Sequence, residues 1–309
     1  MTEKLVVAIG GNMLITDPKT ATFEKQMEKS ASTARVIADL YEKGYQMIIT
    51  HGNGPQVGNL LLQQQNTKVP ALPLRILTAM TQTQIGVMLQ LSLINEFSRR
   101  NIEKDVVVIP TSVKVNLTQE MIENPSKPVG PFYSEEEYDK IKDTGIFKKF
   151  EKGWRKLVPS PRPLSILESR TIATLLEKSL VIAVGGGGTP VSMNGEIQFQ
   201  DGVIDKDRAS AVLADQIDAD LLIILTNVDS VYENYREANQ KEIKNMSVDE
   251  AREMMDSGAL GVGTMLPKVE ACVAFCTKPG RKAIITSDAK IFEALNGHAG
   301  TSISSAQGS

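Results

Sequence analysis

Three consecutive charged residues, Asp205-Lys206-Asp207, stand between the apolar pair Val203-Ile204 and a helix-forming run that continues to Leu213. An aspartate here can cap the first N–H groups of the helix, and its charge suits the positive end of the helix dipole. Lys206 would then lie at a helix N-terminus, beside backbone donors that already suit an anion. The triplet is either a solvated charge cluster or a lysine that two carboxylates position for phosphate chemistry.

Two further lysines occupy constrained places in the sequence. Lys127 lies within residues 124–130, where flanking prolines stiffen the backbone. Lys268 follows Met265-Leu266-Pro267, and proline at that point is typical of the first helical turn. A cation in the first turn opposes the helix dipole, and a bound polyanion would remove the conflict.

Glycine-rich turns follow several apolar, strand-like runs. They are Gly10-Gly11-Asn12, Gly52-Asn53-Gly54 and Gly185–Gly188. Glycine lets a ligand approach the backbone closely, and the carboxyl ends of parallel strands form the edge where α/β proteins bind ligands. The dinucleotide fingerprint, the P-loop motif and the protein-kinase signatures are all missing from the sequence. Glycine turns together with isolated lysines predict a phosphate-handling site.

The segments between these turns alternate between strand and helix patterns, which indicates an α/β protein with a mainly parallel sheet. Residues 24–43 have helical spacing that ends at Gly44, and we expect another amphipathic helix over 166–178. Residues 74–99 form a long helical stretch that is apolar over more than one stripe, so it needs cover on two sides. It is either central to the core or part of a subunit interface, and we favour the interface.

The alternation breaks between about Thr118 and Ser160. This segment contains several prolines, an acidic run at residues 135–137 and the single tryptophan, Trp154. It is too long and too aromatic for a simple loop, so we expect a small subdomain or a lid. Arg162, which follows in Ser160-Pro161-Arg162-Pro163, is framed by prolines in the same way as Lys127.

Composition narrows the class of protein. The 309 residues include 34 Lys and Arg against 37 Asp and Glu, a formal net charge of −3, which argues against a basic surface for nucleic acid. Cys272 and Cys276 offer no disulfide framework and no completed metal site, so we expect two buried thiols. No export signal and no apolar run of about 20 residues is present, which predicts a cytoplasmic protein without a membrane span.

Seven segments, in order between about Val6 and Thr301, resemble the carbamate kinases of the amino acid kinase family. The glycine turns and the Lys-Asp pair are shared by the wider family, whereas the Lys127 and Ser160–Pro163 segments are more particular to carbamate kinases. The segments are residues 8–12, 51–58, 127–130, 160–163, 185–188, 203–207 and 265–268.

The resemblance implies one amino acid kinase domain over residues 1–309, built as a three-layer αβα sandwich around an open, mainly parallel sheet. It also implies a protruding subdomain inserted at residues 118–160, and a homodimer. The implied reaction interconverts carbamoyl phosphate and MgADP with carbamate and MgATP. In arginine fermentation the family runs this reaction toward ATP.

The same resemblance assigns roles to the site. Lys206 and Lys127 would contact the transferring phosphoryl group, Lys268 the nucleotide phosphates, and Asp207 would orient the ammonium groups. The substrate's phosphate would meet Gly10, Gly11, Asn12, Gly52, Asn53 and Gly54. The nucleotide would meet Gly186, Gly187, Thr226, Asn227, Asp229, Tyr232, Met265, Pro267 and Lys268. Carbamate is already an anion, so no general base is required, and no protein-held metal is expected apart from the Mg²⁺ of the nucleotide.

One departure and two alternatives stay open. Other amino acid kinases carry a lysine near the first glycine turn, whereas here Ala8 and Asn12 flank it, and Lys127 would take over that role. The enzymatic alternative is a kinase for another small carboxylate or carbamate, such as acetylglutamate. The other alternative is a nucleotide-binding regulator without turnover.

Overall fold

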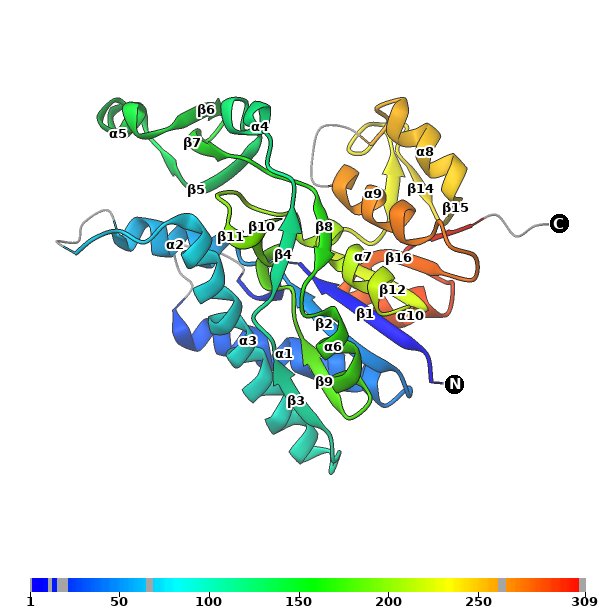
Figure 1. Cartoon of the computed structure of the whole chain (residues 1–309). Coiled ribbons are helices and arrows are strands. Elements are labelled where there is room, and N and C mark those ends of the chain that lie inside the picture. The colour runs from blue at the N-terminus through cyan, green and yellow to red at the C-terminus, as the bar shows by residue number, and fades with distance from the viewer. Residues whose placement is uncertain (1, 11–12, 16–21, 65–68, 261–264, 306–309) are drawn as a thin grey trace.

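The computed structural model of the chain describes residues 2–10, 13–15, 22–64, 69–260 and 265–305. Within these ranges the centre is an eight-stranded sheet in the order β15-β17-β16-β12-β1-β2-β9-β3 (Figure 1). Its neighbouring strands run parallel except for the pair of β16 and β17. The strands are β1 (Lys4–Ile9), β2 (Gln46–His51), β3 (Asp105–Val108), β9 (Ser179–Ile182), β12 (Leu221–Thr226), β15 (Asn245–Ser247), β16 (Lys282–Ser287) and β17 (Thr301–Ser304).

Helices cover both faces of this sheet, because its central strands are apolar on both sides. In β1, Leu5, Val7 and Ile9 pack against one layer, and Val6 and Ala8 pack against the other. The first layer contains α1 (Phe23–Tyr41), α3 (Leu74–Arg99) and α10 (Ile291–Leu295). The second contains α6 (Ser169–Leu176), α7 (Lys206–Gln216), α8 (Val248–Asp256) and α9 (Met265–Phe275). The three-layer αβα sandwich is confirmed.

The direction of the strand order changes between β1 and β12. The chain leaves β1 through α1 and returns in β2 on one side, whereas after β12 it passes through α8 and α9 to β16 on the other side. Open α/β sheets bind their ligands at such a switch point, at the carboxyl ends of the two strands, which here means beside Gly10 and Thr226. A Cβ at Gly10 would lie 2.8 Å from the Leu225 carbonyl oxygen, so this turn packs too closely for a side chain.

The helices agree well with the sequence patterns, with one exception. Helix α3 spans the expected 74–99, and Gly44 has the positive φ of +94° that suits the end of α1. The helix expected from residue 166 is wrong at its start. Residues 163–166 form strand β8 (Pro163–Ile166), in which Ile166 pairs with Val113, and α6 begins only at Ser169. Pairing with a distant strand overrode the local helical spacing.

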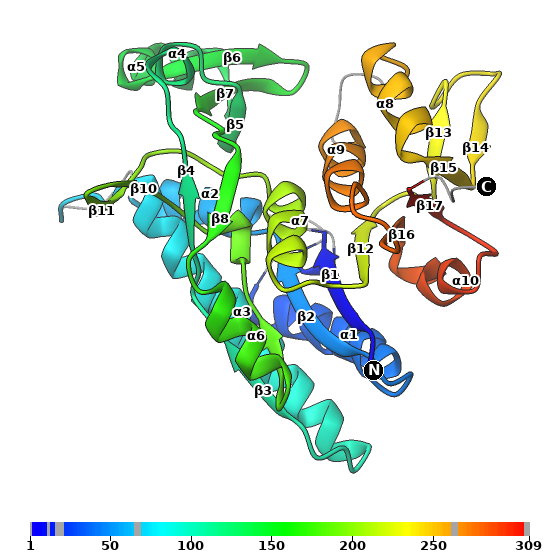
Figure 2. The same ribbon diagram turned by 45° about the vertical axis from the view of Figure 1, so that its right-hand side comes forward.

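A second sheet lies beside the glycine cluster, in the order β11-β10-β4-β8. It contains β11 (Glu196–Phe199), β10 (Thr189–Asn194) and β4 (Ser112–Val115) as well as β8. Strands β10 and β11 form the hairpin predicted at Asn194-Gly195, and Figure 2 shows it at the side of the molecule near α2 (Gly54–Gln64). A separate hairpin of β13 (Val231–Glu233) and β14 (Lys241–Ile243) stands near α8.

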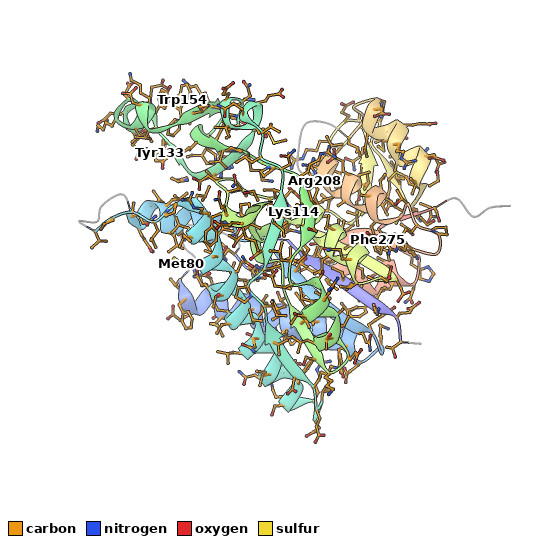
Figure 3. The ribbon with its side chains drawn as sticks, viewed as in Figure 1. Met80, Lys114, Tyr133, Trp154, Arg208 and Phe275 are labelled. Carbon is orange, nitrogen blue, oxygen red and sulfur yellow. The ribbon has the colours of Figure 1, made fainter. Side chains whose placement is uncertain are left out.

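The segment from Thr118 to Val158 stands away from the main sheet (Figure 1). It consists of α4 (Gln119–Glu123), α5 (Glu135–Ile141) and a sheet of β5 (Lys127–Tyr133), β7 (Gly153–Val158) and β6 (Ile146–Phe150). The ring of Trp154 stacks on that of Tyr138 at 3.9 Å, and Figure 3 shows Trp154 and Tyr133 in this segment. We call residues 118–158 the subdomain. The division of the chain into one domain with this insertion stays a prediction.

Among the described residues, none of the helices combines the length and apolar character needed to cross a bilayer.

Candidate active site

The start of α7 is built as the charge triplet predicts. Asp205 has extended φ and ψ and caps the helix, since its Oδ1 accepts a hydrogen bond from the Asp207 N–H at 3.0 Å. Lys206 and Asp207 are the first two helical residues. Of the two aspartates, Asp205 is therefore the cap, and Asp207 is free to point into the site.

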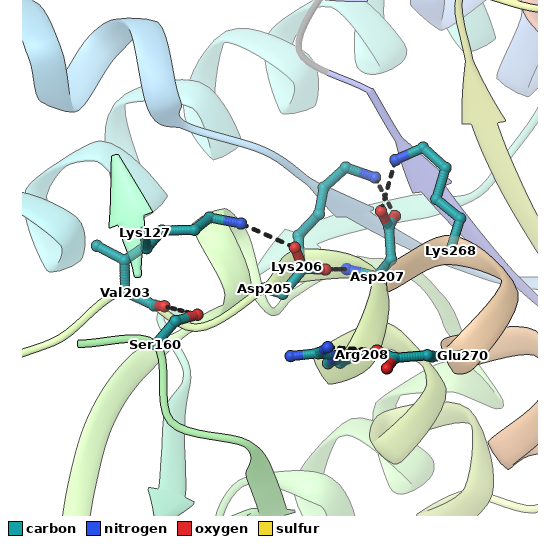
Figure 4. Close-up of polar contacts among 9 residues, drawn as sticks. All are labelled: Lys127, Ser160, Val203, Asp205, Lys206, Asp207, Arg208, Lys268 and Glu270. Atoms are coloured by element: carbon teal, nitrogen blue, oxygen red, sulfur yellow. Dashed lines mark hydrogen bonds and ion pairs between the residues drawn. The ribbon is translucent and has the colours of Figure 1, made fainter. Parts of the chain in front are cut away.

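Asp207 joins two lysines from different helices. Its Oδ1 accepts from Lys206 Nζ at 2.5 Å, and its Oδ2 accepts from Lys268 Nζ at 2.7 Å (Figure 4). The carboxylate is 3% exposed, and Lys268 comes from α9 and is 8% exposed as a residue. Removing charges from water costs free energy, so a buried ion pair contributes little to stability. A buried carboxylate with two ammonium partners therefore indicates that these groups are held there for their positions. The geometry agrees with the predicted role of Asp207.

The third lysine reaches the same place from the subdomain. Lys127 is the first residue of β5, and its Nζ lies 2.9 Å from Asp205 Oδ2. Lys127, Lys206 and Lys268, far apart in the sequence, thus meet around two neighbouring aspartates, and Figure 4 shows the group. Three positive and two negative charges leave one positive charge over. The structure thus brings together the three lysines that the resemblance assigns to phosphate groups, and their contact with a substrate stays a prediction.

Protonation at the site follows from burial and from these neighbours. Burial alone would raise the pKa of Asp205, but Lys127, Lys206 and Lys268 together lower it to about 2. Burial lowers the pKa of Lys206, Lys268 lowers it further, and Asp207 partly offsets both. The aspartate therefore stays ionised at neutral pH, and the lysine is less strongly basic than one in water.

The second glycine turn lies at the carboxyl end of β2. The Gly52 N–H donates to the Ile9 carbonyl at 3.2 Å, so in this structure its hydrogen bond is made to the end of the neighbouring strand β1. Gly54 begins α2, whose N-terminal backbone donors suit an anion. Asn53 is buried, and its Nδ2 donates to Thr81 Oγ1 at 2.9 Å. Gly11 and Asn12, predicted beside them, lie outside the described residues.

The four-glycine cluster has a packing reason that the sequence did not reveal. Gly186 has φ of +62°, and a Cβ there would lie 2.1 Å from Asn53 Nδ2. A Cβ on Gly187, whose φ is +87°, would lie 2.5 Å from the Ile204 carbonyl oxygen. The glycine cluster thus allows both Asn53 and Ile204, the residue before Asp205, to pack closely against its backbone. Contact of Gly186 and Gly187 with a nucleotide stays a prediction.

The remaining predicted nucleotide residues follow β12 or begin α9. Thr226 Oγ1 donates to Asn227 Oδ1 at 3.3 Å, and Asp229 Oδ1 accepts from Ser287 Oγ at 2.6 Å. Tyr232, in β13, is half-buried. Its burial raises the pKa of its hydroxyl, and the negative charge of Glu242 raises it further. Met265 and Pro267 lie in the first turn of α9 (Met265–Phe275), next to Lys268. These residues come from the β12 side of the switch point.

Some residues near the site were missed by sequence reasoning. His51 is buried, and burial, with a contribution from Lys206, lowers its pKa to about 4. Thr81 and Gln82 of α3 are also buried; Gln82 Nε2 donates to the Thr111 carbonyl at 3.1 Å and to Thr189 Oγ1 at 2.9 Å. The sequence did contain a signal for Thr81 and Gln82, since they are adjacent polar residues in a largely apolar helix. Polar groups that are buried in this way need hydrogen-bond partners.

Metal binding by the protein alone finds no support in the described part of the chain. No group of three or more His, Cys, Asp or Glu side chains gathers there in a way that would hold an ion. Asp205 and Asp207 already accept from lysines. An ion that enters with a nucleotide would take most of its ligands from the phosphates and water, as Mg²⁺ commonly does.

Comparisons with known proteins agree with this geometry. The model of the amino acid kinase family matches residues 3–287. The carbamate kinase of Thermococcus kodakarensis is 42% identical, covering 97% of this chain and 99% of that protein. Carbamate kinase 2 of Enterococcus faecalis is 45% identical, with 97% and 98% covered. The structure of carbamate kinase from Giardia lamblia bound to AMP-PNP has a TM-score of 0.90 at 35% identity, with 98% and 99% covered. The chain belongs to the amino acid kinase family and, within it, to the carbamate kinases.

Proposed function

We propose that this chain is a carbamate kinase, a phosphotransferase that moves a phosphoryl group between ATP and carbamate. In one direction ADP and carbamoyl phosphate give ATP and carbamate, and carbamate then breaks down to ammonia and CO₂. Support comes from relatives named carbamate kinase at 40–45% identity over nearly the whole chain. ATP and ADP are its nucleotide substrates.

The observation that carries the proposal is the convergence of Lys127, Lys206 and Lys268 on Asp205 and Asp207. Phosphoryl transfer depends mainly on positioning and on neutralising the charge of the moving group. Ammonium groups from the subdomain, α7 and α9 supply that charge from three directions. Asp207 keeps two of them at a fixed spacing before substrate arrives.

The roles divide along the two sides of the site. Lys206 and Lys127 contact the transferring phosphoryl group, and Lys268 contacts the nucleotide phosphates, whose Mg²⁺ neutralises further charge. The turns at Gly10 and Asn53-Gly54 supply backbone N–H donors to the phosphate of carbamoyl phosphate, and each donor of this kind is typically worth about 3 kcal/mol. The segment after β12, with Asn227 and Tyr232, receives the nucleoside.

Purified protein supplied with MgADP and carbamoyl phosphate should form ATP, measured by a coupled luminescence assay. The reverse assay should consume ATP with carbamate and leave acetylglutamate unphosphorylated, which separates the two kinase alternatives. Nucleotide binding without ATP formation would instead support the non-catalytic regulator and refute this function.

The same proposal includes a cytoplasmic homodimer. Helix α3 leaves apolar side chains exposed along its outer side, at Met80, Val87, Leu91 and Ile94. Such a stripe suits a subunit interface. The two thiols, Cys272 and Cys276, are buried and unpaired, which agrees with a reducing compartment where ATP and ADP are plentiful.

A further inference from the structure

A short connection leaves the subdomain beside Lys127 and runs to the two helices that carry the other lysines. We call residues 158–162 the strap. Val158, at the end of β7, is the register partner of Lys127 in β5. The first residue of the strap is therefore fixed by strand pairing to the lysine that the subdomain contributes.

The middle of the strap is bonded to the chain just before Asp205. The Val203 N–H donates to the Pro159 carbonyl at 2.9 Å. Ser160 Oγ donates to the Val203 carbonyl at 2.9 Å, as Figure 4 shows. The approach at Gly202 is close, since a Cβ there would lie 3.1 Å from the Pro159 carbonyl oxygen. Asp205, which accepts from Lys127, lies only two residues after Val203.

The far end of the strap approaches Glu270, a carboxylate that joins α7 to α9. Glu270 Oε2 accepts from Arg208 Nε at 2.8 Å and also from Arg208 Nη2, and its Oε1 lies 3.7 Å from Arg162 Nη2. Arg208 follows Asp207 in α7, and Glu270 lies two residues after Lys268 in α9. The two helices are thus connected twice, by Asp207 with Lys268 and by Arg208 with Glu270 (Figure 4).

We propose that Ser160 and Glu270 are positioning residues for the phosphoryl transfer, with Arg162 as the link between them. Glu270 sets the spacing of α7 and α9 through Arg208, which places Lys268 beside Lys206 and Asp207. Ser160 hydrogen-bonds to the Val203 carbonyl, and this contact positions Asp205 next to Lys127. The proposal rests on the function proposed above, and it assigns a use to the Ser160–Pro163 segment beyond its resemblance to a family motif.

The expected effects are large because reacting groups tolerate little displacement; a misplacement of about 1 Å can cost about 100-fold in rate. The two positioning residues should also differ in their effects. Glu270 acts through Lys268 on the nucleotide side, and Ser160 acts through Asp205 and Lys127 on the carbamoyl phosphate side. A residue that only stabilised the fold would not produce this difference.

The first experiment measures steady-state ATP formation by wild type, Glu270→Gln and Asp215→Asn. Glu270→Gln keeps the shape and one oxygen acceptor but loses the charge, and kcat/KM for ADP should fall at least tenfold. Asp215 lies on the same helix α7, nine residues after Lys206, and forms ion pairs with Arg281 at 2.5 Å and with Lys278 at 2.7 Å, which Asp215→Asn removes. It should lower Tm while kcat/KM stays within twofold of wild type.

The second experiment tests the other positioning residue with Ser160→Ala. This variant should lower kcat/KM for carbamoyl phosphate at least threefold while KM for ADP stays within twofold. In a Lys268→Ala background, Glu270→Gln should cost less than twofold more, because the lysine that it positions is gone.

The inference is overturned if Glu270→Gln retains at least half of the wild-type kcat/KM for ADP, or if Asp215→Asn loses as much as Glu270→Gln. If Glu270→Gln does not fold, Arg162→Ala decides; Arg162 is 71% exposed, and its loss should lower the same parameter about threefold or else refute the link. Wild type in the same assay tests the proposed function separately, since its inactivity would reject that function before any variant is compared.

Discussion

Lys206 and Asp207 are consecutive residues in the first turn of α7, and Lys206 and Lys268 both donate to the Asp207 carboxylate. The carboxylate between two ammonium groups reduces their mutual repulsion and keeps them in place. A substrate phosphate then encounters cations that are already ordered, so little reorganisation remains at the moment of transfer.

Lys206→Ala should reduce kcat of ATP formation at least about 100-fold, equivalent to about 3 kcal/mol of transition-state stabilisation. The reason is the loss of the cation assigned to the transferring phosphoryl group. Lys140→Ala, at an exposed position of the subdomain, is the matched control and should keep wild-type kcat. A near-normal rate for the Lys206 variant would show that the charge acts elsewhere.

His51 should make folding stability depend on pH. Its pKa is lowered to about 4 in the folded chain by burial, against an ordinary 6.5. Because the folded pKa is the lower one, the stabilisation is complete above pH 6.5 and is lost as pH falls toward 4. At about 1.36 kcal/mol per pH unit the loss approaches about 3 kcal/mol.

Urea unfolding of wild type and His51→Gln between pH 7 and pH 4.5 measures this effect. The variant should show a flatter pH dependence of the unfolding free energy, whatever its absolute stability. Parallel curves for the two proteins would assign the acid sensitivity to other groups.

At the scale of single elements, the sequence predicted those that local rules specify. Asp205 was among the predicted caps, α3 has the predicted bounds, and Gly44 ends α1. Ile166, the last residue of β8, was taken for the start of a helix because its strand partner Val113 is far away in sequence. The reason for four glycines was likewise invisible, since Asn53 and Ile204 reach Gly186 and Gly187 only in the folded chain.

Gly186→Ala should destabilise the protein and impair its activity. At φ of +62° an alanine is strained by about 1–2 kcal/mol, and its Cβ would also displace Asn53. Gly195→Ala, with φ of +89° and no atom within 4 Å of an added Cβ, carries the strain alone. Thermal unfolding and kcat for both variants separate the two effects. Equal losses in both would mean that the contact with Asn53 is unimportant.

At the scale of the whole molecule, the sequence was sufficient for the layer architecture and for the family of the chain. The resemblance to carbamate kinases implied that Lys127, Lys206 and Lys268 would share one phosphate-handling site. The side-chain contacts around the site were not predictable, because Arg208 with Glu270 and Asn53 with Thr81 join residues whose separation in sequence follows no spacing rule. Such pairs become visible only once helices pack.

The outer side of α3 predicts the oligomeric state. Leu91→Glu places a charge within the exposed apolar stripe of Met80, Val87, Leu91 and Ile94, and it should convert the proposed dimer to a monomer in sedimentation velocity. Ile146→Glu is the control, since Ile146 is equally apolar and exposed but lies in the subdomain. A monomeric wild type would remove the interface assignment for α3.

The surplus positive charge around Asp205 and Asp207 has a practical consequence for anyone who handles the enzyme. A cluster of ammonium groups attracts simple tetrahedral oxyanions by the same charge that attracts carbamoyl phosphate. Orthophosphate and sulfate in a buffer should therefore compete with carbamoyl phosphate, raising its apparent KM without changing kcat. The same crowding makes these salts natural additives for keeping Lys127, Lys206 and Lys268 together during storage.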